Sequence, residues 1–368
     1  MLPEQEELLS RIAQPLLTWY DSNRRVLPWR EDPTPYHVWV SEIMLQQTRV
    51  EAVKEYYARF LRELPTIRDL AEAEEDLLLK LWEGLGYYNR VRNMQKCAQV
   101  IEREYGGRMP GNYEELLALP GIGNYTAGAI SSIAFGQVNP AVDGNVLRVV
   151  TRVLADDTDI MNTGFRSKVE QSLRSEMSGE RPGDFNQAMM DIGATVCVPN
   201  GAPHCEECPL HAFCKACAKG TQTRYPVKKA QKERRVEDKT VLLMLDADRI
   251  ALHKRPSKGL LAGMYEFPML DGKHTDQEVL QYLKDQGLQT IQILSLGEAK
   301  HVFSHIEWHM IGYWVRVDEL TPFRGEKQQE LADGTVFVEI EKASREYAIP
   351  SAFSAYAKQL NIKRGEQQ

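Results

Sequence analysis

The stretch LPGIGNYTAGAI, residues 119–130, decides how the first part of this chain is expected to fold. A proline and two glycines, Gly121 and Gly123, separate two short segments, so the sequence predicts a helix, a tight turn and a second helix over about residues 113–134. The first amides of a helix have no partner within it and carry partial positive charge, which favours an anion such as phosphate. An ordinary turn between two helices is the alternative that this stretch leaves open.

The stretch PAVDGNVLRVVTR, residues 140–152, follows the second of these helices. If Asn145 begins a further helix, Asp143 lies at its N-terminal end. The partial charge and free amides there favour the ionised carboxylate, so we expect Asp143 to stay charged. A simple helix cap is the alternative.

Glu42 lies in a different environment, inside the stretch VWVSEIMLQQTRV, residues 38–50. Thr34 and Pro35 predict the start of a helix, and Glu42 lies near the apolar side of it, between Val40 and Ile43. Partial burial without a cation would raise the pKa of Glu42 and keep it protonated near neutrality. An exposed glutamate is the alternative. One ionised and one protonated carboxyl are the pair that cleavage of a glycosidic bond requires.

Composition sets the wider limits. The chain has 368 residues, of which 43% are hydrophobic, so two or three domains are expected. It has no apolar run of the roughly 20 residues that span a bilayer, and its acidic, amphipathic N-terminus is not a signal peptide, so we expect a cytoplasmic protein with no membrane partner. The net charge of −7 argues mildly against a nucleic-acid partner unless cations gather on one face.

Five of the six cysteines lie within residues 197–217, whereas Cys97 is isolated. The spacing Cys197-x7-Cys205-x2-Cys208-x5-Cys214 is typical of four thiolates that hold zinc or a 4Fe–4S cluster, and spacing alone does not choose between them. Cys217 follows Cys214 with C-x2-C spacing and is a possible substitute ligand, although we favour Cys214.

The chain is expected to have two main parts joined by a linker. Residues 1–217 predict an all-helical domain with the cysteine module at 197–217, and residues 218–237 predict a basic linker that is either merely solvated or touches phosphate. Residues 238–365 predict an α+β domain, with strands in KTVLLML, RIALHKR and HVFSHIEWHMIGYWVRV and helices in DQEVLQYLKDQG and IPSAFSAYAKQL.

Several long motifs together indicate a family. LPGIGNYTA followed by VDGNVLR resembles the helix–hairpin–helix DNA glycosylases of the endonuclease III superfamily, and LPWR, VSEIMLQQTRV, WEGLGYYNR, FNQAMMDIG and HVFSH narrow the resemblance to the MutY family of adenine DNA glycosylases. GLLAGMYEFP and the strand order are similar to the Nudix fold, but DQEVLQYLKDQG lacks the acidic box of a Nudix hydrolase. The resemblance implies a catalytic domain with an iron–sulfur module and a Nudix-like recognition domain.

The resemblance also implies roles for individual residues. Glu42 would protonate adenine at N7, Asp143 would stabilise or briefly bond to the sugar cation, and Tyr125 and Asn145 would orient these two carboxyls. Endonuclease III-like enzymes have a lysine where this chain has Tyr125, and a phenol cannot form a Schiff base, so we expect a glycosylase without lyase activity.

The remaining assignments concern the adenine, the duplex, the opposite base and the cofactor. The matched residues are Arg25, Leu27, Trp29 and Gln187 around the adenine; Gln47 and Tyr87 in the duplex beside it; Gly121 and Gly123 at the DNA backbone; Phe303, Ser304 and His305 at 8-oxoguanine; and Cys197, Cys205, Cys208 and Cys214 at a 4Fe–4S cluster. The family usually has six residues in the first gap between cysteines, whereas this chain has seven, so this loop is one residue longer. Without the resemblance, a core histidine would be the preferred interpretation of His305.

The expected function is therefore removal of adenine mispaired with 8-oxoguanine, or with guanine, in duplex DNA by flipping the base out of the stack. We expect a monomer that needs no nucleotide cofactor. The alternatives are an endonuclease III-like glycosylase and lyase, against which Tyr125 argues, a Nudix hydrolase, against which the missing acidic box argues, and a non-catalytic DNA-binding module, against which both carboxyls argue.

Overall fold

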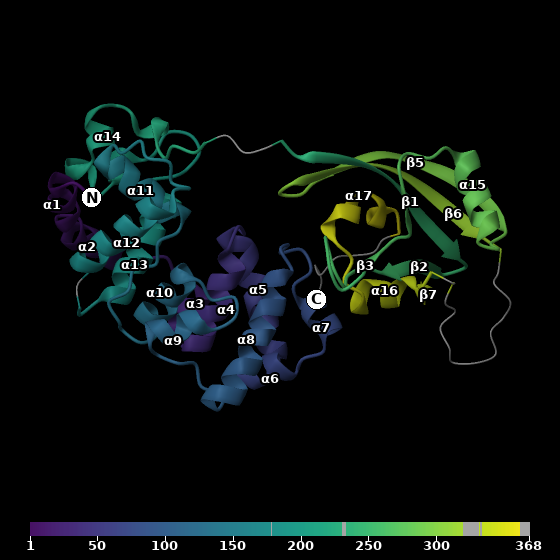
Figure 1. The fold of residues 1–368 in the computed structure, drawn as a ribbon, viewed down its shortest axis with the longest axis horizontal. Coiled ribbons are helices and arrows are strands. Elements are labelled where there is room, and N and C mark those ends of the chain that lie inside the picture. The colour runs from purple at the N-terminus through teal and green to yellow at the C-terminus, as the bar shows by residue number, and fades with distance from the viewer. Residues whose placement is uncertain (178, 230–232, 319–330, 332, 361–368) are drawn as a thin grey trace. The chain divides into compact units, whose positions relative to one another are not determined.

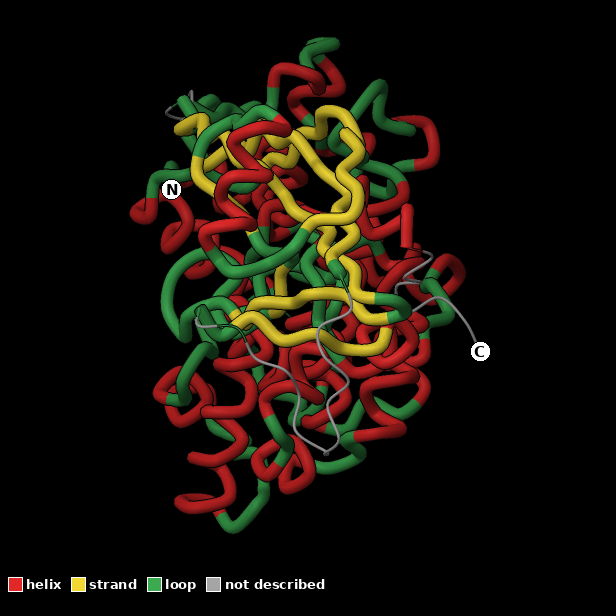
Figure 2. The backbone as a smooth tube through the Cα atoms, turned by 90° about the vertical axis from the view of Figure 1, so that its right-hand side faces the viewer, coloured by secondary structure: helices red, strands yellow, loops and turns green. Residues whose placement is uncertain are grey.

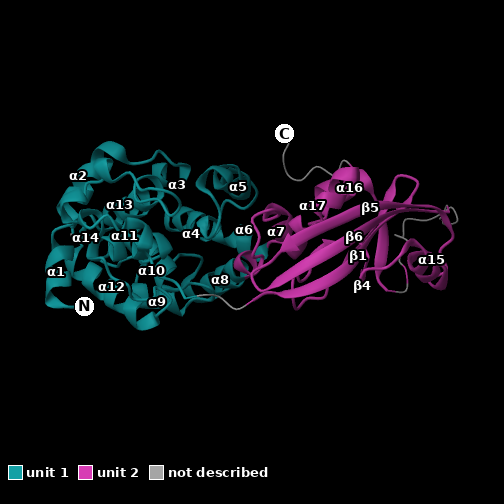
Figure 3. Cartoon of the chain, turned by 90° about the horizontal axis from the view of Figure 1, so that it is seen from above, with its two compact units in different colours: residues 1–72, 93–231 teal, residues 73–92, 232–368 magenta. Residues whose placement is uncertain are grey.

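The structure is a computed structural model that describes residues 1–177, 179–229, 233–318, 331 and 333–360. Contacts divide the chain into unit 1, residues 1–72 and 93–231, and unit 2, residues 73–92 and 232–368. Figure 1 shows the elements of each unit along the chain, and Figure 3 colours unit 1 teal and unit 2 magenta. No helix in the described part of the chain is long and apolar enough to cross a membrane.

Unit 1 consists of helices and turns, as the sequence predicts. Helix α4 (Pro35–Leu45) begins where expected, because the Thr34 hydroxyl accepts a hydrogen bond from the amide of His37 at 3.2 Å. Helix α5 (Val50–Glu63) buries Val53, Tyr57 and Phe60, which share one helical face. The other helices that lie in unit 1, wholly or in part, are α1 Pro3–Ser10, α2 Ala13–Asn23, α3 Pro28–Glu31, α6 Ile67–Glu72, α8 Asn89–Tyr105 from residue 93 onward, α9 Tyr113–Ala118, α10 Asn124–Ile133, α11 Gly144–Leu154, α12 Thr163–Glu176, α13 Pro182–Thr195 and α14 Lys215–Ala218, with the 3₁₀ turns η1 Cys205–Glu207, η2 His211–Phe213 and η3 Gln222–Arg224.

The predicted hairpin of two helices is present as α9 and α10. Gly121, in the turn between them, has a φ of +76°, and a Cβ atom at this residue would lie 2.7 Å from the Cβ of Asn93, so the turn requires glycine. Gly128 in α10 approaches Pro140 so closely that a Cβ there would overlap its carbonyl oxygen. This close approach brings the segment that carries Asp143 against the helix that carries Tyr125.

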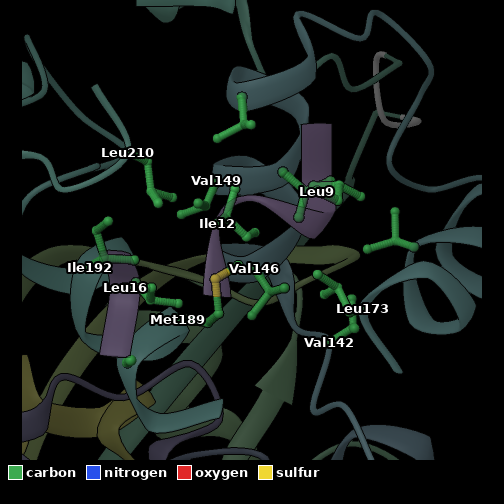
Figure 4. Close-up of a cluster of buried hydrophobic side chains, with 14 of the residues drawn as sticks. Leu9, Ile12, Leu16, Val142, Val146, Val149, Leu173, Met189, Ile192 and Leu210 are labelled. Carbon is green, nitrogen blue, oxygen red and sulfur yellow. The ribbon is translucent and has the colours of Figure 1, made fainter. Parts of the chain in front are cut away.

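Helix α11 is held by a large apolar core, shown in Figure 4. Leu9 of α1, Ile12 directly before α2 and Leu16 of α2 are fully buried in the same cluster as Val146 and Val149 of α11. Burial of such side chains contributes about 1.5–3 kcal/mol each. The packed face of α11 thus fixes the position of its N-terminal end, where Asp143 lies.

Unit 2 folds around a mixed sheet, whose strands are yellow in Figure 2. In its described part, the order along the sheet is β3-β2-β1-β6-β5, with β4 paired to β1 and β7 paired to β2. Strands β1 and β6 are parallel and the other pairs are antiparallel. The bounds are β1 Arg235–Asp246, β2 Arg249–Lys254, β3 Tyr265–Glu266, β4 Met269–Asp271, β5 Thr290–Val302, β6 Ile306–Val317 and β7 Thr335–Glu339, with helices α7 Glu75–Leu81, α15 Asp276–Asp285, α16 Ile340–Glu346 and α17 Ser354–Ala357 and the turns η4 Ser351–Phe353 and η5 Lys358–Leu360.

The predicted strands and the helix α15 are confirmed. Asp246 pairs with Arg249 across a two-residue turn, so β1 and β2 form the expected hairpin. Residues 301–317 contribute the end of β5 and all of β6, which are antiparallel neighbours. The closing helix is only partly as expected, because residues 351–360 form three short helical pieces in place of one helix.

The division into units differs from the expected boundaries at residues 217 and 237. Residues 73–92 belong to unit 2, where Asp76 accepts from Lys254 at 2.8 Å and the buried Glu83 accepts from the amide of Ile349 at 2.8 Å. Residues 218–229 belong to unit 1, where the carbonyl of Val227 accepts from the amide of Ile160 at 3.1 Å. Backbone and buried carboxylate contacts, which composition does not reveal, account for both differences.

Candidate active site and DNA interface

One cavity of about 1110 Å³ in unit 1 collects most of the predicted catalytic residues. It is lined by the loop before α3, by α4 and the turn after it, by α10, by the start of α11 and by α13. The predicted site residues that line it are Arg25, Leu27, Trp29, Glu42, Gln47, Tyr125, Asp143, Asn145 and Gln187. Residues that are up to 162 positions apart in the sequence, from Arg25 to Gln187, therefore meet at one site.

Glu42 is buried, as the sequence predicts, and only 4% of it is exposed. The hydroxyl of Tyr125 donates a hydrogen bond to Glu42 Oε2 at 2.5 Å, and Met190 Sδ lies 3.9 Å from the same hydroxyl. Burial raises the pKa of Glu42 to about 7, the hydrogen bond from Tyr125 opposes that rise, and the charge of Asp143 adds to it. Glu42 is therefore able to hold a proton and release it near neutral pH.

Asp143 caps α11, as expected. Its Oδ1 accepts from the amide of Val146 at 2.8 Å, and its Oδ2 accepts from the side-chain amide of Asn145 at 2.8 Å. The sequence predicts that the helix end favours the charged form of Asp143, and the hydrogen bonds from Val146 and Asn145 act in that direction. Burial raises the pKa of Asp143, and the hydrogen bonds from Val146 and Asn145 offset this only in part.

A buried ion-pair network beside the cavity was not predicted. Asp191 is fully buried and binds two guanidinium groups, with Arg25 Nη2 at 2.6 Å and Arg30 Nη1 at 2.8 Å. Burial would raise the pKa of Asp191, but the hydrogen bonds and charges of Arg30 and Arg25 outweigh burial and hold this pKa below its usual range. The network fixes the segment that carries Leu27 and the short helix α3, which carries Trp29. The only sequence signal was a lone aspartate within the apolar stretch FNQAMMDIG.

Arg148 is a second residue that the sequence analysis missed. It is 5% exposed, and it donates to Asn145 Oδ1 at 3.0 Å, to the carbonyl of Gly193 at 2.6 Å and to the carbonyl of Cys197 at 2.9 Å. It thereby orients the amide that binds Asp143. Its position one turn after Asn145 in VDGNVLR was the available signal.

The charge of the cavity is opposite to that of the whole chain. Two of its lining residues, Glu42 and Asp143, are acidic, whereas six are cationic. The cationic lining residues are Arg25, Arg30, Arg49, Arg148, Arg166 and Lys228. Such a local excess attracts a polyanion even when the net charge is negative. Lys228 belongs to the predicted basic linker, so one linker cation lines the same cavity.

The helix-hairpin turn offers a separate backbone site. Gly123 is the N-terminal cap of α10 and, being glycine, has no side chain to cap the amides of this helix end. A Cβ at Gly123 would meet nothing within 4 Å. The turn thus presents open backbone at the positive end of a helix, which is the geometry that suits a phosphate.

All five clustered cysteines line one small apolar cavity in unit 1. Arg152 donates to Cys197 Sγ at 3.3 Å, and the amide of Cys217 donates to Cys214 Sγ at 3.4 Å. Burial raises the pKa of Cys208 to about 12 and that of Cys214 to about 11, so these thiols need a cation to ionise near neutrality. Among the described residues, no group of three or more histidine, cysteine, aspartate or glutamate side chains lies close enough together to hold a single metal ion.

In unit 2, Phe303, Ser304 and His305 form the tight turn between β5 and β6. The amide of Phe303 donates to the carbonyl of Ile306 at 2.8 Å, and Phe303 packs edge-on against Trp308 at 4.9 Å between ring centroids. Ser304 and His305 are exposed, so the interpretation of His305 as a core residue is wrong. The hydroxyl of Tyr87 lies 3.0 Å from Ser304 Oγ within the same unit.

Gln47 and Tyr87 share an unusual backbone conformation. Both are exposed, and both have positive φ values, +61° and +49°. Left-handed backbone is costly for residues other than glycine and concentrates at functional sites. The sequence gives no direct signal of this conformation, although Tyr87 follows Gly86 directly.

Comparisons with known proteins agree with this arrangement. Residues 40–175 match the HhH-GPD superfamily of base excision DNA repair proteins, and residues 240–359 match the NUDIX domain. A thermostable thymine-DNA glycosylase has a similar structure, with a TM-score of 0.53 and 29% identity over 59% of this chain and 98% of that one. Endonuclease III in a non-covalent complex with DNA gives a TM-score of 0.51 and 25% identity over 60% of this chain and all of that one.

The sequence relatives extend over both units. The adenine DNA glycosylase of Rattus norvegicus is 37% identical and covers 83% of this chain and 70% of its own length. The human adenine DNA glycosylase is 36% identical over 90% of this chain and 73% of its own length. The adenine DNA glycosylase of Buchnera aphidicola subsp. Baizongia pistaciae is 34% identical over 84% of this chain and 87% of its own length. With this identity over most of both chains, the protein belongs to the adenine DNA glycosylase family.

Proposed function

We propose that this protein removes adenine from duplex DNA when adenine lies opposite 8-oxoguanine, and that unit 1 performs the hydrolysis. The observation that carries the proposal is the pair of carboxyls in one cationic cavity, Glu42 with its pKa of about 7 and Asp143 at a helix end. Both carboxyls and their hydrogen-bond partners come from unit 1 of a single chain, which supports a reaction carried out by a monomer. Among the cations of the cavity, Arg49, Arg166 and Lys228 support binding of the DNA backbone, whereas Arg25 and Arg30 are paired with Asp191.

The chemistry follows from the environments of the two carboxyls. Protonated Glu42 donates its proton to N7 of the extruded adenine, so the bond between N9 and C1′ breaks and its electron pair leaves with the base. The anionic Asp143 stabilises the positive charge that forms on the sugar. Water then adds to C1′, and the proton that it loses returns to a carboxylate. Tyr125 and Asn145 hold these carboxyls through their hydrogen bonds at 2.5 and 2.8 Å.

The surroundings of the base and the duplex are proposed from the same geometry. Leu27 and Trp29 offer apolar surface to adenine, while Arg25 and Gln187 offer polar groups. Gln47 and Tyr87, with their strained and exposed conformations, enter the duplex beside the extruded base. The open turn at Gly121 and Gly123 binds a backbone phosphate.

Tyr125 makes the proposed reaction a hydrolysis without strand cleavage. Burial and the charges of Glu42 and Asp143 raise its pKa well above the usual range, so it is neither an amine nor a phenolate at neutral pH. In an assay with end-labelled duplex, we expect free adenine and an abasic site that breaks only in hot alkali. Strand cleavage without alkali, or efficient trapping of a covalent adduct with borohydride, would favour the rival glycosylase and lyase.

We assign recognition of the base opposite adenine to the turn of Phe303, Ser304 and His305 in unit 2. In 8-oxoguanine, N7 becomes a donor and C8 carries an oxygen. Ser304 offers a small hydroxyl that accepts from N7–H, His305 adds a ring nitrogen, and Phe303 anchors the turn by packing against Trp308. The contact between Tyr87 and Ser304 supports this assignment, because it places a proposed duplex-entering residue beside the proposed reader of the base.

The cysteine module is proposed to hold a 4Fe–4S cluster through Cys197, Cys205, Cys208 and Cys214. The cluster would cross-link the segment 197–217, while the residues of the cavity carry out the reaction. We expect the purified protein to contain iron and sulfide in equal amounts. Cys214→Ser should lose the colour of the cluster and Cys217→Ser should keep it, whereas the reverse result would assign the fourth ligand to Cys217.

A further inference from the structure

The loop that carries Tyr87 is folded around one arginine. Residues 84–87 include three with positive φ, which are Gly84, Gly86 and Tyr87 at +98°, +69° and +49°. Arg90 Nη2 donates to the carbonyl of Leu85 at 2.8 Å and to that of Gly86 at 2.9 Å. One guanidinium thus bridges two successive carbonyls of the loop and fixes its curvature.

The same guanidinium lies against two aromatic rings. Its central carbon is 5.2 Å from the centroid of Trp82 and 5.8 Å from the centroid of Tyr87. Trp82 is fully buried, and its indole nitrogen donates to the carbonyl of Gly86 at 3.2 Å. Tyr87 is 52% exposed. The buried ring therefore anchors the arginine, and the arginine supports the exposed ring.

Left-handed backbone at a bulky residue such as Tyr87 persists only when its surroundings impose it. The contacts of Arg90 supply this constraint, since they fix the two residues before Tyr87 and contact its ring. We propose that Arg90, anchored on Trp82, is a positioning residue that holds Tyr87 in the conformation in which it enters the duplex. This inference rests on the proposed role of Tyr87.

A double-mutant cycle tests whether Arg90 acts through Tyr87. The proteins are the wild type, Tyr87→Ala, Arg90→Met and the double variant, each measured by excision of adenine opposite 8-oxoguanine with enzyme in excess and below saturation. We expect Tyr87→Ala and Arg90→Met each to lower the second-order rate about 10-fold. The double variant should fall within about twofold of Tyr87→Ala alone, because the arginine no longer has a ring to position.

Two further variants make the cycle decisive. Arg103→Met removes an exposed arginine of the same helix, whose described partner is Glu104, and should keep the wild-type rate. If Arg90→Met does not fold, as judged by its thermal unfolding, Arg90→Lys replaces it. It keeps a charged donor for both carbonyls but lacks the flat guanidinium that lies against Trp82 and Tyr87, so it should retain the coupling with a smaller loss of about threefold.

Multiplicative losses in the double variant would overturn the positioning role of Arg90 while leaving Tyr87 in its proposed role. A wild-type rate in Tyr87→Ala would instead overturn the role of Tyr87 itself, and the inference with it. A loss in Arg90→Met that is the same in both backgrounds, accompanied by a lower unfolding midpoint, would make Arg90 a residue of general stability.

Discussion

The cavity of unit 1 and the turn of unit 2 place their polar groups in opposite environments. Glu42 is 4% exposed and hydrogen-bonded to Tyr125, whereas Ser304 and His305 are exposed on a tight turn. The difference follows from their proposed tasks. An acid that works near neutral pH needs burial to raise its pKa, while a group that reads a base can stay in water until DNA covers it. Changes in the cavity should therefore affect the rate, and changes in the turn should affect the choice of substrate.

The largest effect is expected from Asp143→Asn. The substitution keeps the size of the side chain but removes the charge that stabilises the sugar cation, so excision at saturation should fall at least about 1000-fold. Affinity for the duplex should change little, because the neighbouring cations remain. Single-turnover excision and fluorescence anisotropy measure the two quantities. Asp157→Asn, an exposed aspartate, is the control, and wild-type excision by the Asp143 variant would remove this residue from the mechanism.

Glu42→Gln should have the next largest effect. The amide fills the same space but has no proton to give to the base, and a general acid contributes about 100- to 10,000-fold. Excision at saturation should fall by at least about 100-fold. Glu51→Gln, on the exposed surface of α5, should leave the rate unchanged. A Glu42 variant that keeps more than about a tenth of the wild-type rate would show that another group protonates adenine.

The double variant Ser304→Ala with His305→Ala should change specificity more than chemistry. A lost hydrogen bond that leaves a polar group unpaired costs about 1–3 kcal/mol, or about 5- to 150-fold. The excision efficiency opposite 8-oxoguanine should fall by this factor toward the efficiency opposite guanine. Both efficiencies must be measured below saturation at one salt concentration, with Ser295→Ala as the control variant. An unchanged ratio of the two efficiencies would mean that the turn does not read the base.

Tyr125→Phe should have the smallest effect on the rate and a distinctive effect on its pH dependence. The hydroxyl bonds to Glu42 and opposes the rise of its pKa, so its removal should move that pKa further above 7, by about one unit. The rate at pH 7 should change by less than about 10-fold. A pH profile that coincides with that of the wild type, with Tyr105→Phe as the control, would show that the bond does not tune Glu42.

Most of the fold could be predicted from local patterns. Thr34 and Pro35 give the start of α4, glycine and aspartate residues give the hairpin turns, and the alternation of apolar residues gives the strands. The segment 73–92 could not be assigned in this way. Its membership of unit 2 depends on single polar contacts, such as that between Glu83 and the amide of Ile349, which no periodicity encodes.

The site was predictable where motifs are long and was missed where side chains meet only in space. Glu42 and Asp143 follow from their sequence surroundings, but the pairing of Asp191 with Arg25 and Arg30 joins residues that are more than 160 positions apart. The sequence also does not show the balance of effects on the pKa of Asp143. The sequence shows that it caps a helix, and only the structure shows that burial outweighs the hydrogen bonds of the cap.

The pH dependence of adenine excision by the wild-type protein, in single turnover at saturation, tests the central claim most directly. Glu42 must be protonated to act, and its pKa is about 7, so the rate should fall tenfold per pH unit as the pH rises above about 7. Asp143 must be ionised, so the rate should also fall as the pH drops through its raised pKa. A rate that stays constant from pH 6 to pH 9 would contradict the proposal that Glu42 donates the proton that releases adenine.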